Sequence, residues 1–209
     1  EGLVIREGAR IERVERGAGM VRAIISTANG TETIEGTHLL VAAGRRPNVK
    51  GLGLDAAGVE FSPTGVTVDA RLRSTNKRVF AIGDVAGGYQ FTHMAAYHAG
   101  IVIRNALFNL PAKVDYRAVP WVTYTDPELA HVGTTEAAAK DKLAGASAVA
   151  CPFAENDRAQ AERATDGFVK VVLDRSGVVI GATIVGRHAG ELILPWVLAV
   201  QQRLKIAAM

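Results

Sequence analysis

The chain has 209 residues, of which 48% are hydrophobic and 22% are charged, a balance that allows a globular protein to bury a sizeable core. Its 24 basic and 21 acidic side chains leave a net charge of +3, and the scatter of the basic residues argues against a nucleic-acid-binding surface. The one cysteine, Cys151, excludes an intrachain disulfide, a dithiol redox pair and a cysteine-cluster metal site within this chain, and no apolar run reaches the roughly 18 residues of a membrane span.

The N-terminus, Glu1-Gly2-Leu3, lacks an initiating methionine and the charged and apolar pattern of a secretory leader. We therefore expect no signal peptide, and the start is typical of a fragment. A single cysteine is compatible with a reducing compartment, so we expect a cytoplasmic protein.

The first 44 residues predict short strands joined by turns. Leu3–Arg6, Ala9–Arg16 and Met20–Ile25 read as strands, with a turn at residues 17–19. Asn29-Gly30 lies between two β-rich segments, which is the strongest short signal for a hairpin. Together these patterns predict an antiparallel meander.

Two continuous apolar runs predict strands that are buried on both faces, as in a parallel sheet. The first, Thr37–Ala43, leads into Gly44-Arg45, and His38 is expected to be a hydrogen-bonded residue at its edge. The second, Val79–Ile82, leads into Gly83-Asp84. A loop-rich stretch with a short strand at Val66–Val68 separates them.

After Asp84 the sequence predicts a helix over Thr92–Asn109, with Thr92 as its N-cap and Pro111 beyond its end. A domain boundary is expected near Ala112–Val119. The remainder predicts four strands with a hairpin between the last two, a helix at Thr134–Lys140, and a closing helix interrupted by Pro195; these segments are Trp121–Thr125, Ala148–Phe153, Gly167–Leu173, Val178–Val185 and Gly190–Leu204.

The ends of the two predicted buried strands are candidates for a nucleotide site. Ligands of parallel α/β sheets lie beyond the carboxyl ends of the strands, where Gly44 and Gly83 would let a ligand approach the backbone. The Asp84 carboxylate would accept hydrogen bonds from sugar or ribityl hydroxyls. The helix from Thr92 would point its free N–H groups at the same corner. Alternatively, Gly83-Asp84 is only a turn in which Asp84 caps a backbone amide.

Four motifs, in order, give the chain a resemblance to a known family. They are Leu39–Asn48, Val66–Asp84, Gln90–Ala96 and Pro120–Gly133. They resemble the FAD-dependent pyridine nucleotide–disulfide oxidoreductases, which include dihydrolipoamide dehydrogenase, glutathione reductase and mercuric reductase. The Gln90–Ala96 motif is similar to the mercuric-reductase-like branch in particular.

The resemblance implies an α/β fold with an α+β C-terminal domain. Residues 1–44 would be the remnant of an NAD(P)-binding domain, residues 45–115 the second segment of an FAD-binding domain, and residues 116–209 an incomplete dimerisation domain of mixed sheet and helices. The parent protein would be a homodimer that passes hydride from NAD(P)H through FAD to a disulfide, a metal ion or another small-molecule acceptor.

The same resemblance assigns residues to the cofactors. Asp84, with Gly83, would hold the FAD ribityl chain, and Gly44 would pass near the nicotinamide nucleotide. The backbone of the segment before and into the helix would face the flavin; its residues are Gln90, Phe91, Thr92 and His93.

Several features of the family are missing from the sequence. Neither of its two G-x-G-x-x-G turns is present, and Gly51–Gly58 has the wrong spacing for one. The redox cysteine pair is also absent, and the C-terminal His-Pro pair with its Glu would lie beyond Met209. We therefore expect no catalytic residue in this chain, no turnover by it alone, and a fragment that binds no flavin by itself.

Two alternatives for function remain open. This chain by itself would be a non-catalytic dimerisation module, or the parent would be an NADH oxidase-like flavoprotein without a redox dithiol.

Other candidate residues have structural interpretations. His93 and His98 are five residues apart and do not share a helical face, so no metal site is expected. Cys151 is expected to be inert and partly buried. His131 and His188 are expected at the surface or an interface. Arg158 and Glu162 are expected to form a solvated helix pair.

Overall fold

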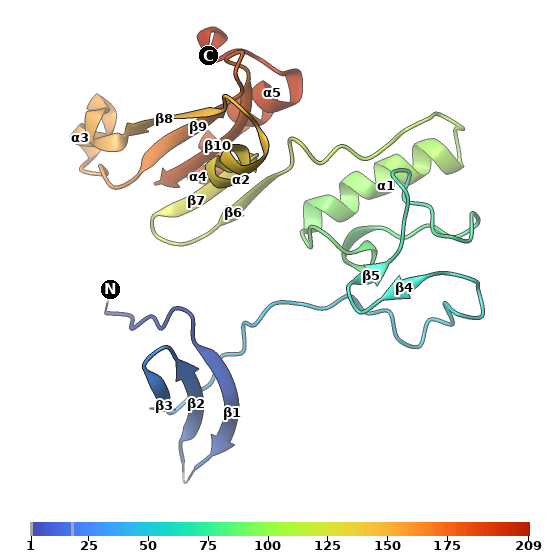
Figure 1. The fold of residues 1–209 in the computed structure, drawn as a ribbon, viewed down its shortest axis with the longest axis horizontal. Helices are drawn as coiled ribbons and strands as arrows, with labels where there is room; N and C mark the ends of the chain where they lie inside the picture. Colours follow the sequence, from blue (N-terminus) through green and yellow to red (C-terminus); the bar gives the residue numbers. More distant parts are fainter. Residues whose placement is uncertain (1, 18) are drawn as a thin grey trace.

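The computed structural model describes residues 2–17 and 19–209 (Figure 1). Glu1 and Ala18 lie outside the described residues, so the expectation on the first residue and the centre of the predicted turn at 17–19 are not addressed. Three parts follow one another along the chain: an N-terminal sheet, a central segment with one long helix, and a C-terminal sheet with short helices (Figure 1).

The N-terminal sheet is the predicted antiparallel meander. It consists of β1 (Arg10–Arg16), β2 (Val21–Thr27) and β3 (Gly30–Gly36) in the order β1-β2-β3. The hairpin predicted from Asn29-Gly30 is confirmed: Ala28 and Asn29 form the β2–β3 turn, and Gly30 begins β3, where it pairs with Thr27. The hydroxyl of Thr27 stabilises the turn by accepting from Asn29 N–H at 3.2 Å and donating to the Gly30 carbonyl at 3.1 Å. The predicted strand at Leu3–Arg6 was wrong, since these residues form no strand.

The predicted buried strand at Thr37–Ala43 was also wrong. The segment is extended without a strand partner, and Leu40 is 89% exposed. A strand of a parallel sheet forms only where neighbours on both sides take up its N–H and C=O groups, and the described residues supply none to this run. His38 is also exposed. Among the described residues, the hydrogen-bond partner of its ring is the hydroxyl of Thr37.

The central segment is mostly irregular. It contains the two-residue strands β4 (Phe61–Ser62) and β5 (Gly65–Val66), the 3₁₀ turn η1 (Gly83–Ala86) and the helix α1 (Thr92–Ala106). The second predicted buried strand, Val79–Ile82, was wrong: it makes one isolated bridge, between Arg73 and Phe80, and Ile82 is exposed. As at 37–43, the described chain offers no flanking strands to complete a sheet.

Two small cores hold the central segment together. Val49, Val59, Val66 and Ala81 bury one, and Leu72, Ile101 and Ala112 bury the other. Leu72 is fully buried although its backbone has a φ of 63°. The preceding loop is fixed by Asp69, whose carboxylate accepts from the N–H groups of Arg71 and Arg73 at 2.8 and 3.0 Å.

Helix α1 follows the helical period on its buried face, because Met94, His98 and Ile101 recur at the spacing of one face. The sequence predicted Thr92 as the N-cap, but the N-cap is Phe91, and no side chain caps the helix. At the other end, the Asn105 amide donates to the carbonyls of Ile101 and Ala112 at 2.9 and 2.7 Å. Asn105 therefore turns the chain back along the helix.

The C-terminal sheet has five antiparallel strands in the order β6-β7-β10-β9-β8. The strands are β6 (Pro120–Thr123), β7 (Glu128–Gly133), β8 (Ser147–Pro152), β9 (Phe168–Leu173) and β10 (Val179–Gly186). All four predicted strands are confirmed within a few residues, and β7 was not predicted. The predicted hairpin between β9 and β10 is closed by Asp174, whose Oδ1 accepts from Ser176 N–H at 2.8 Å and Val178 N–H at 3.0 Å.

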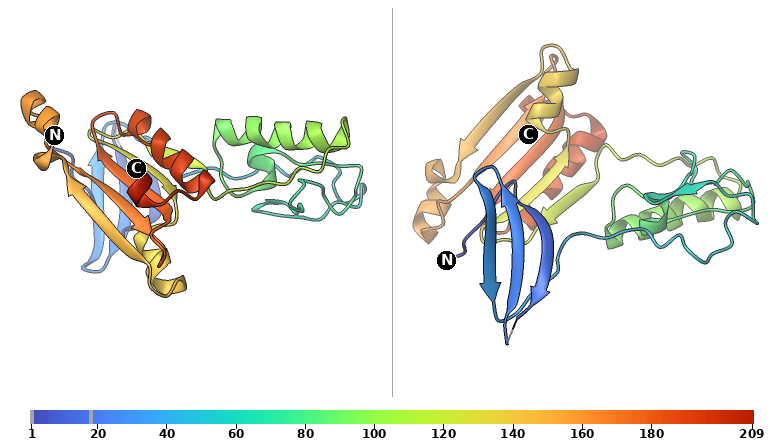
Figure 2. Two further views of the ribbon diagram at one scale, coloured as in Figure 1. Left: turned by 90° about the horizontal axis from the view of Figure 1, so that it is seen from above. Right: turned by 60° about the horizontal axis from the view of Figure 1, so that its bottom comes forward.

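Short helices accompany this sheet (Figure 2). Thr135 caps α2, accepting from Ala138 N–H at 3.3 Å. The predicted closing helix is interrupted as expected, with Pro195 in the first turn of α5, where a missing N–H costs nothing. The helical elements are α2 (Glu136–Lys142), η2 (Phe153–Glu155), α3 (Asp157–Glu162), α4 (Ala189–Leu192), α5 (Leu194–Gln202) and η3 (Ile206–Ala208).

The core of the C-terminal unit lies between the sheet and helices α4 and α5. Ala130, Val132, Ala182 and Ile184 of the central strands are each at most 1% exposed. They pack in one cluster with residues of the two helices, including Ala199. This unit buries the largest apolar cluster of the described chain.

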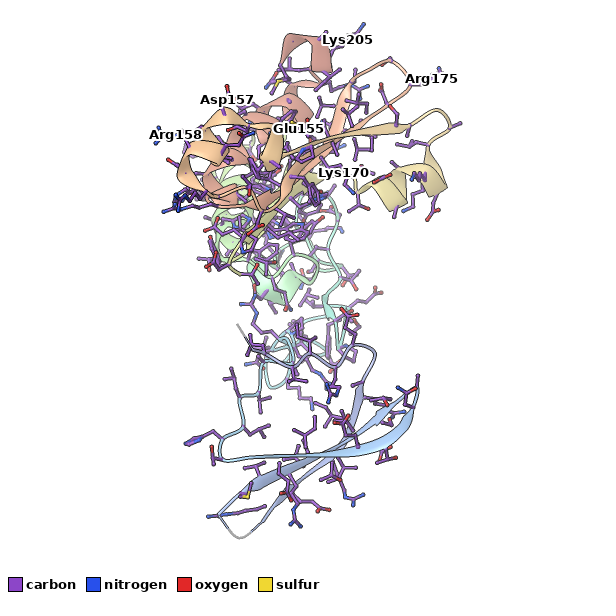
Figure 3. All side chains as sticks on the ribbon, turned by 90° about the vertical axis from the view of Figure 1, so that its left-hand side faces the viewer. Glu155, Asp157, Arg158, Lys170, Arg175 and Lys205 are labelled. Atoms are coloured by element: carbon purple, nitrogen blue, oxygen red, sulfur yellow. The ribbon has the colours of Figure 1, made fainter. Side chains whose placement is uncertain are left out.

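Charged side chains of this unit form surface pairs. Arg158 and Glu162, predicted as a solvated pair, meet at 2.6 Å, with the Arg158 side chain 82% exposed. Lys170, which is labelled in Figure 3 with Arg158, donates to Glu136 Oε2 at 3.0 Å. Within residues 2–17 and 19–209, every helix is too short or too polar to serve as a membrane span.

Two sequence interpretations in this unit need correction. Cys151 is exposed and not partly buried, because β8 is an edge strand whose six residues are all exposed. His131 is buried and not at the surface, because β7 lies between β6 and β10. His188 is exposed, as expected.

Candidate functional site

The turn η1 carries the Gly83-Asp84 pair and lies against helix α1. Gly83 has a φ of 64°, in the left-handed region that favours glycine. A Cβ at this position would lie 3.0 Å from the Cβ of Ala95, so the missing side chain is also what lets the turn approach the helix. Asp84 is thereby held at the edge of the helix, and not at the end of a strand.

The β4–β5 hairpin packs against the other side of the same turn. Gly87, with a φ of 73°, ends the turn, and its N–H donates to the Asp84 carbonyl at 3.1 Å. A Cβ on Gly87 would lie 2.5 Å from the carbonyl oxygen of Thr64. The turn is therefore fixed between the hairpin and α1, with no room for a side chain at either glycine.

The Asp84 carboxylate is available to a ligand. Its side chain is 46% exposed, and no described residue donates a hydrogen bond to it. One cation is nearby: Nη1 of Arg45 lies 3.8 Å from Asp84 Oδ2. At this separation and exposure the pair contributes little to stability, so displacing it for a ligand costs little.

Arg45 connects three predicted site segments. It follows Gly44, it faces Asp84, and its Nη2 donates to the carbonyl oxygen of Gln90. Gly44 itself has a φ of 89° and open space where a Cβ would stand. The residues after Gly44, the η1 turn and the segment before α1 thus meet around one guanidinium group.

The segment from Gln90 into α1 presents backbone and aromatic rings. Phe91 accepts from Met94 N–H at 3.0 Å, and its ring stacks on that of His93 with centroids 5.3 Å apart. Thr92 and His93, at the start of the helix, are exposed, and the first turn of α1 contains no acidic residue. The positive end of the helix dipole is therefore free of a neutralising side chain.

His98 is the residue of this site that the sequence interpretation missed. Its ring is 2% exposed, its Nδ1 accepts from Gly83 N–H at 3.0 Å, and its Nε2 lies 3.0 Å from the hydroxyl of Tyr116. Burial lowers its pKa from the ordinary value. The signal in the sequence was its spacing from Met94 and Ile101, which puts a polar side chain on the buried face of α1.

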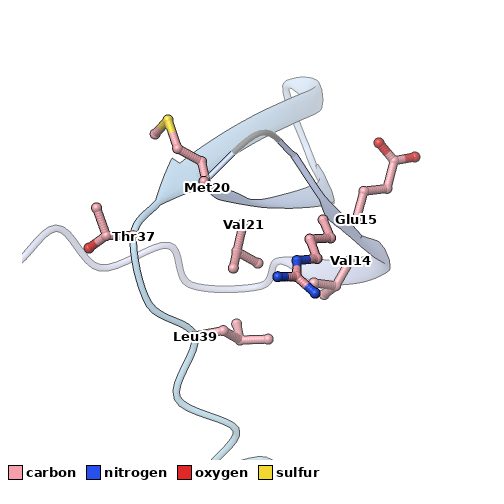
Figure 4. A pocket seen from close by; sticks show the side chains of 8 residues that line it. Val14, Glu15, Met20, Val21, Thr37 and Leu39 are labelled. Carbon is pink, nitrogen blue, oxygen red and sulfur yellow. The ribbon is translucent and has the colours of Figure 1, made fainter.

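The most voluminous hollows lie elsewhere. One of about 550 Å³ lies at the end of the N-terminal sheet and is lined by residues of β1, β2 and the segment after β3; Figure 4 labels Val14, Glu15, Met20, Val21, Thr37 and Leu39. It contains none of the predicted site residues. The described residues contain no group of three or more His, Cys, Asp or Glu side chains placed to hold a metal ion.

Comparison with known proteins connects this geometry to a family. Residues 1–99 match the family model of the pyridine nucleotide-disulphide oxidoreductases, and residues 119–209 match the model of the dimerisation domain of the same family. The chain belongs to the pyridine nucleotide-disulphide oxidoreductases. The α/β fold with a dimerisation domain, the relation to dihydrolipoamide dehydrogenase and the relation to mercuric reductase are thus confirmed.

Two curated relatives from bacteria illustrate the similarity. A mercuric reductase of Lysinibacillus sphaericus is 39% identical over 204 residues, which cover 96% of this chain and 37% of that protein. A dihydrolipoyl dehydrogenase of Geobacillus stearothermophilus is 42% identical over 177 residues, which cover 83% of this chain and 37% of the relative. The chain therefore spans less than half the length of these relatives.

Solved structures agree in fold. LpdA of Mycobacterium tuberculosis superposes with a TM-score of 0.88 at 33% identity, covering 99% of this chain and 45% of that one. The HOCl-induced flavoprotein disulfide reductase RclA of Escherichia coli superposes with a TM-score of 0.82 at 28% identity, covering 95% and 45%. The segments that are extended here, 37–43 and 79–82, thus belong to a fold of which this chain supplies less than half.

Proposed function

We propose that this chain is the central and C-terminal part of an FAD-dependent oxidoreductase, in which hydride passes from NAD(P)H through the flavin to a disulfide, a metal ion or another small acceptor. The observation that carries the proposal is the exposed Asp84 carboxylate on a turn held by Gly83 and Gly87, beside the uncapped start of α1. In this proposal residues 1–44 come from the NAD(P) domain, residues 45–115 from the FAD domain and residues 116–209 from the dimerisation domain.

The groups present fit a flavin nucleotide. A half-exposed carboxylate without donors of its own suits a polyhydroxyl chain, whose neutral hydroxyls donate to it. When bound, the flavin supplies the redox chemistry, and the protein orients it and adjusts its electrostatics. Asp84 would bind the ribityl hydroxyls, and Gly83 would keep the backbone close enough for this contact.

The segment from Gln90 to His93 would lie along the flavin with its backbone. The start of α1 provides a positive dipole end and free N–H groups, which favour negative charge on a neighbouring ring. Arg45 holds the Gln90 carbonyl and so orients this segment. Gly44, one residue earlier and without a side chain, would leave space for the nicotinamide nucleotide.

The C-terminal unit supports a homodimer. Leu194 and Leu198 lie one helical turn apart on α5 and are 61% and 51% exposed, although the opposite face of the helix is buried. An apolar helix face of this kind suits a two-fold interface with a second copy of the protein. The cytoplasmic location stays a prediction that depends on the single cysteine.

The proposal is tested with the full-length protein. We expect a yellow protein with bound FAD that oxidises NAD(P)H, and we expect Asp84→Ala to weaken FAD binding while Asp55→Ala, at an exposed loop position, leaves it unchanged. A full-length protein that stays colourless and cannot be reconstituted with FAD would contradict the proposal.

A second candidate function concerns this chain by itself. The self-contained core of residues 120–209 and the exposed leucines of α5 favour a dimerisation module without catalysis. Light scattering at micromolar concentration distinguishes the cases, because a strict monomer would count against this module. A parent without a redox dithiol, like an NADH oxidase, would be recognised by the absence of a cysteine pair in the full-length sequence.

A further inference from the structure

His98 occupies a buried position between two parts of the chain. It lies on α1, is 2% exposed, and bridges the backbone of Gly83 in η1 to the side chain of Tyr116, which lies in the link to the C-terminal unit. Both distances are 3.0 Å. A buried polar side chain on an otherwise apolar helix face is retained only where its hydrogen bonds are satisfied, and here both ring nitrogens have a partner.

The partners determine which nitrogen carries the proton. The Gly83 N–H group is only a donor, so Nδ1 of His98 must be the unprotonated acceptor. In the neutral ring the proton then lies on Nε2, which donates to the Tyr116 hydroxyl oxygen. In a ring protonated at both nitrogens, the Nδ1–H group would face the Gly83 N–H group, and two donors cannot form a hydrogen bond. The lowered pKa of buried His98 agrees with the neutral form.

The bond to Gly83 acts one residue away from Asp84. Gly83 is buried, and its N–H would have no partner in the described structure without His98. Ala95, one helical turn before, limits how closely the turn can approach α1, and His98 fixes its direction by hydrogen bonding. Because Asp84 is the next residue, the orientation of its carboxylate depends on this contact.

We infer that His98 is a positioning residue of the flavin site: its ring holds the Gly83 backbone in the turn that presents Asp84, and Tyr116 holds the ring in the required orientation. The inference rests on the proposed function, since it assigns a role to a residue behind the proposed ribityl contact. Neither His98 nor Tyr116 would touch the flavin in this arrangement.

Three variants of the full-length protein test the inference through FAD affinity. His98→Leu removes both bonds, whereas His98→Asn places its Oδ1 where Nδ1 lies and keeps the acceptor for Gly83. Tyr116→Phe removes only the hydroxyl. We expect His98→Leu to weaken FAD binding about tenfold or more, His98→Asn to stay within about threefold of wild type, and Tyr116→Phe to lie between them.

Two further readouts separate positioning from general stability. The KM for NAD(P)H of FAD-loaded enzyme should not change, and the absorption spectrum of bound flavin should shift in His98→Leu and return in His98→Asn. His188→Leu is the matched control, because the His188 ring is exposed and belongs to the C-terminal unit, and it should match wild type. Equal FAD affinity of His98→Leu and wild type, or equal weakness of His98→Asn and His98→Leu, would overturn the inference.

A measurement on the wild-type holoprotein covers the case in which His98→Leu does not fold. Long-range ¹H–¹⁵N NMR should show His98 neutral with its proton on Nε2, and a proton on Nδ1 would overturn the inference. If the wild-type protein binds no FAD at all, the proposed function fails instead, and the tautomer measurement still decides whether His98 holds Gly83.

Discussion

The five-stranded C-terminal sheet and the three-stranded N-terminal sheet are both antiparallel, yet they bury very different amounts of side chain. Every residue of β1 is exposed, and the buried positions of the N-terminal sheet are Ile24 and Ile25 of β2. In the C-terminal sheet, helices α4 and α5 bury a face that includes Val132, Ala182 and Ile184. Strand pairing is the same in kind, so we expect the two sheets to differ in stability because of what covers each of them.

The two sheets depend on their surroundings to different degrees. A sheet whose apolar face is covered by its own helices is stable as a unit. A bare meander gains little from burial, and its stability depends on what it contacts in the complete protein.

The largest effect is expected from one matched pair of substitutions. Ile184→Ala, at a position 1% exposed, should lower the free energy of unfolding of the C-terminal unit by about 2–5 kcal/mol. Both tryptophans, Trp121 and Trp196, lie in this unit, so urea unfolding followed by their fluorescence measures it. Ile34→Ala in β3, where the side chain is 41% exposed, should change the hydrogen-exchange protection of β2 by less than about 0.5 kcal/mol. Equal effects would remove the contrast.

The central segment should lie nearer the C-terminal unit in this respect. Leu72 is fully buried against Ile101 and Ala112, so Leu72→Ala should cost about 2–3 kcal/mol, the lower part of the usual range because this core is small. The measurement is thermal unfolding followed by circular dichroism of α1. A loss below about 0.5 kcal/mol would show that this small core does not hold the helix.

A pH dependence should distinguish the covered sheet. Burial lowers the pKa of His131, against an opposing contribution from its bond to the Gly133 carbonyl at 3.0 Å. The Gly133 carbonyl can only accept, so Nε2 carries the proton of the neutral ring, and Nδ1 then accepts from the Thr183 hydroxyl at 2.8 Å. Since the folded pKa lies below the unfolded value of about 6.5, stability from this site is complete above pH 6.5 and is lost as the pH falls towards the folded pKa.

Urea unfolding at a series of pH values, followed by tryptophan fluorescence, measures this dependence. His131→Gln should flatten it between pH 6.5 and 5, whereas the exposed His188, replaced by Gln, should leave it unchanged. A wild-type unfolding free energy that does not fall below pH 6.5 would contradict the expected sign.

The smallest effect is expected at the surface. Arg158 and Glu162 meet at 2.6 Å, but the Arg158 side chain is 82% exposed, so Arg158→Ala should change the unfolding free energy by less than about 0.5 kcal/mol. Urea unfolding at low and high salt is the measurement. A loss above 1 kcal/mol, removed by salt, would mean that the pair belongs to a wider charge network.

Local signals in the sequence were sufficient for some elements. The hairpins predicted from Asn29-Gly30 and Asp174–Gly177 are present, because a turn is determined by the residues in and beside it. The period of α1 and the interruption at Pro195 are local in the same sense. Strand β7 was missed, because Glu128 and His131 interrupt its apolar pattern, although β6 and β10 flank it on both edges.

The failures concern partners distant in sequence. Leu40 and Val41 are as apolar as a buried strand requires, yet they are exposed because strand formation needs neighbours that the run itself does not contain. At the site, the segments carrying Gly44, Asp84 and Gln90 do meet as the motifs implied. The support by His98 was not foreseen, because its partners, Gly83 and Tyr116, lie 15 and 18 residues away.

The link between α1 and β6 contains no helix or strand, but it is not flexible along its whole length. It runs back along the helix: Asn105 donates to Ala112, the Tyr97 hydroxyl accepts from Asp115 N–H at 2.7 Å, and His98 reaches Tyr116. The part of the link that is not anchored to the helix is therefore only the few residues between Tyr116 and Pro120. A protease should find its first cleavage sites in the exposed stretch 37–46, and the C-terminal unit should move about the short stretch between Tyr116 and Pro120 and not about the whole link.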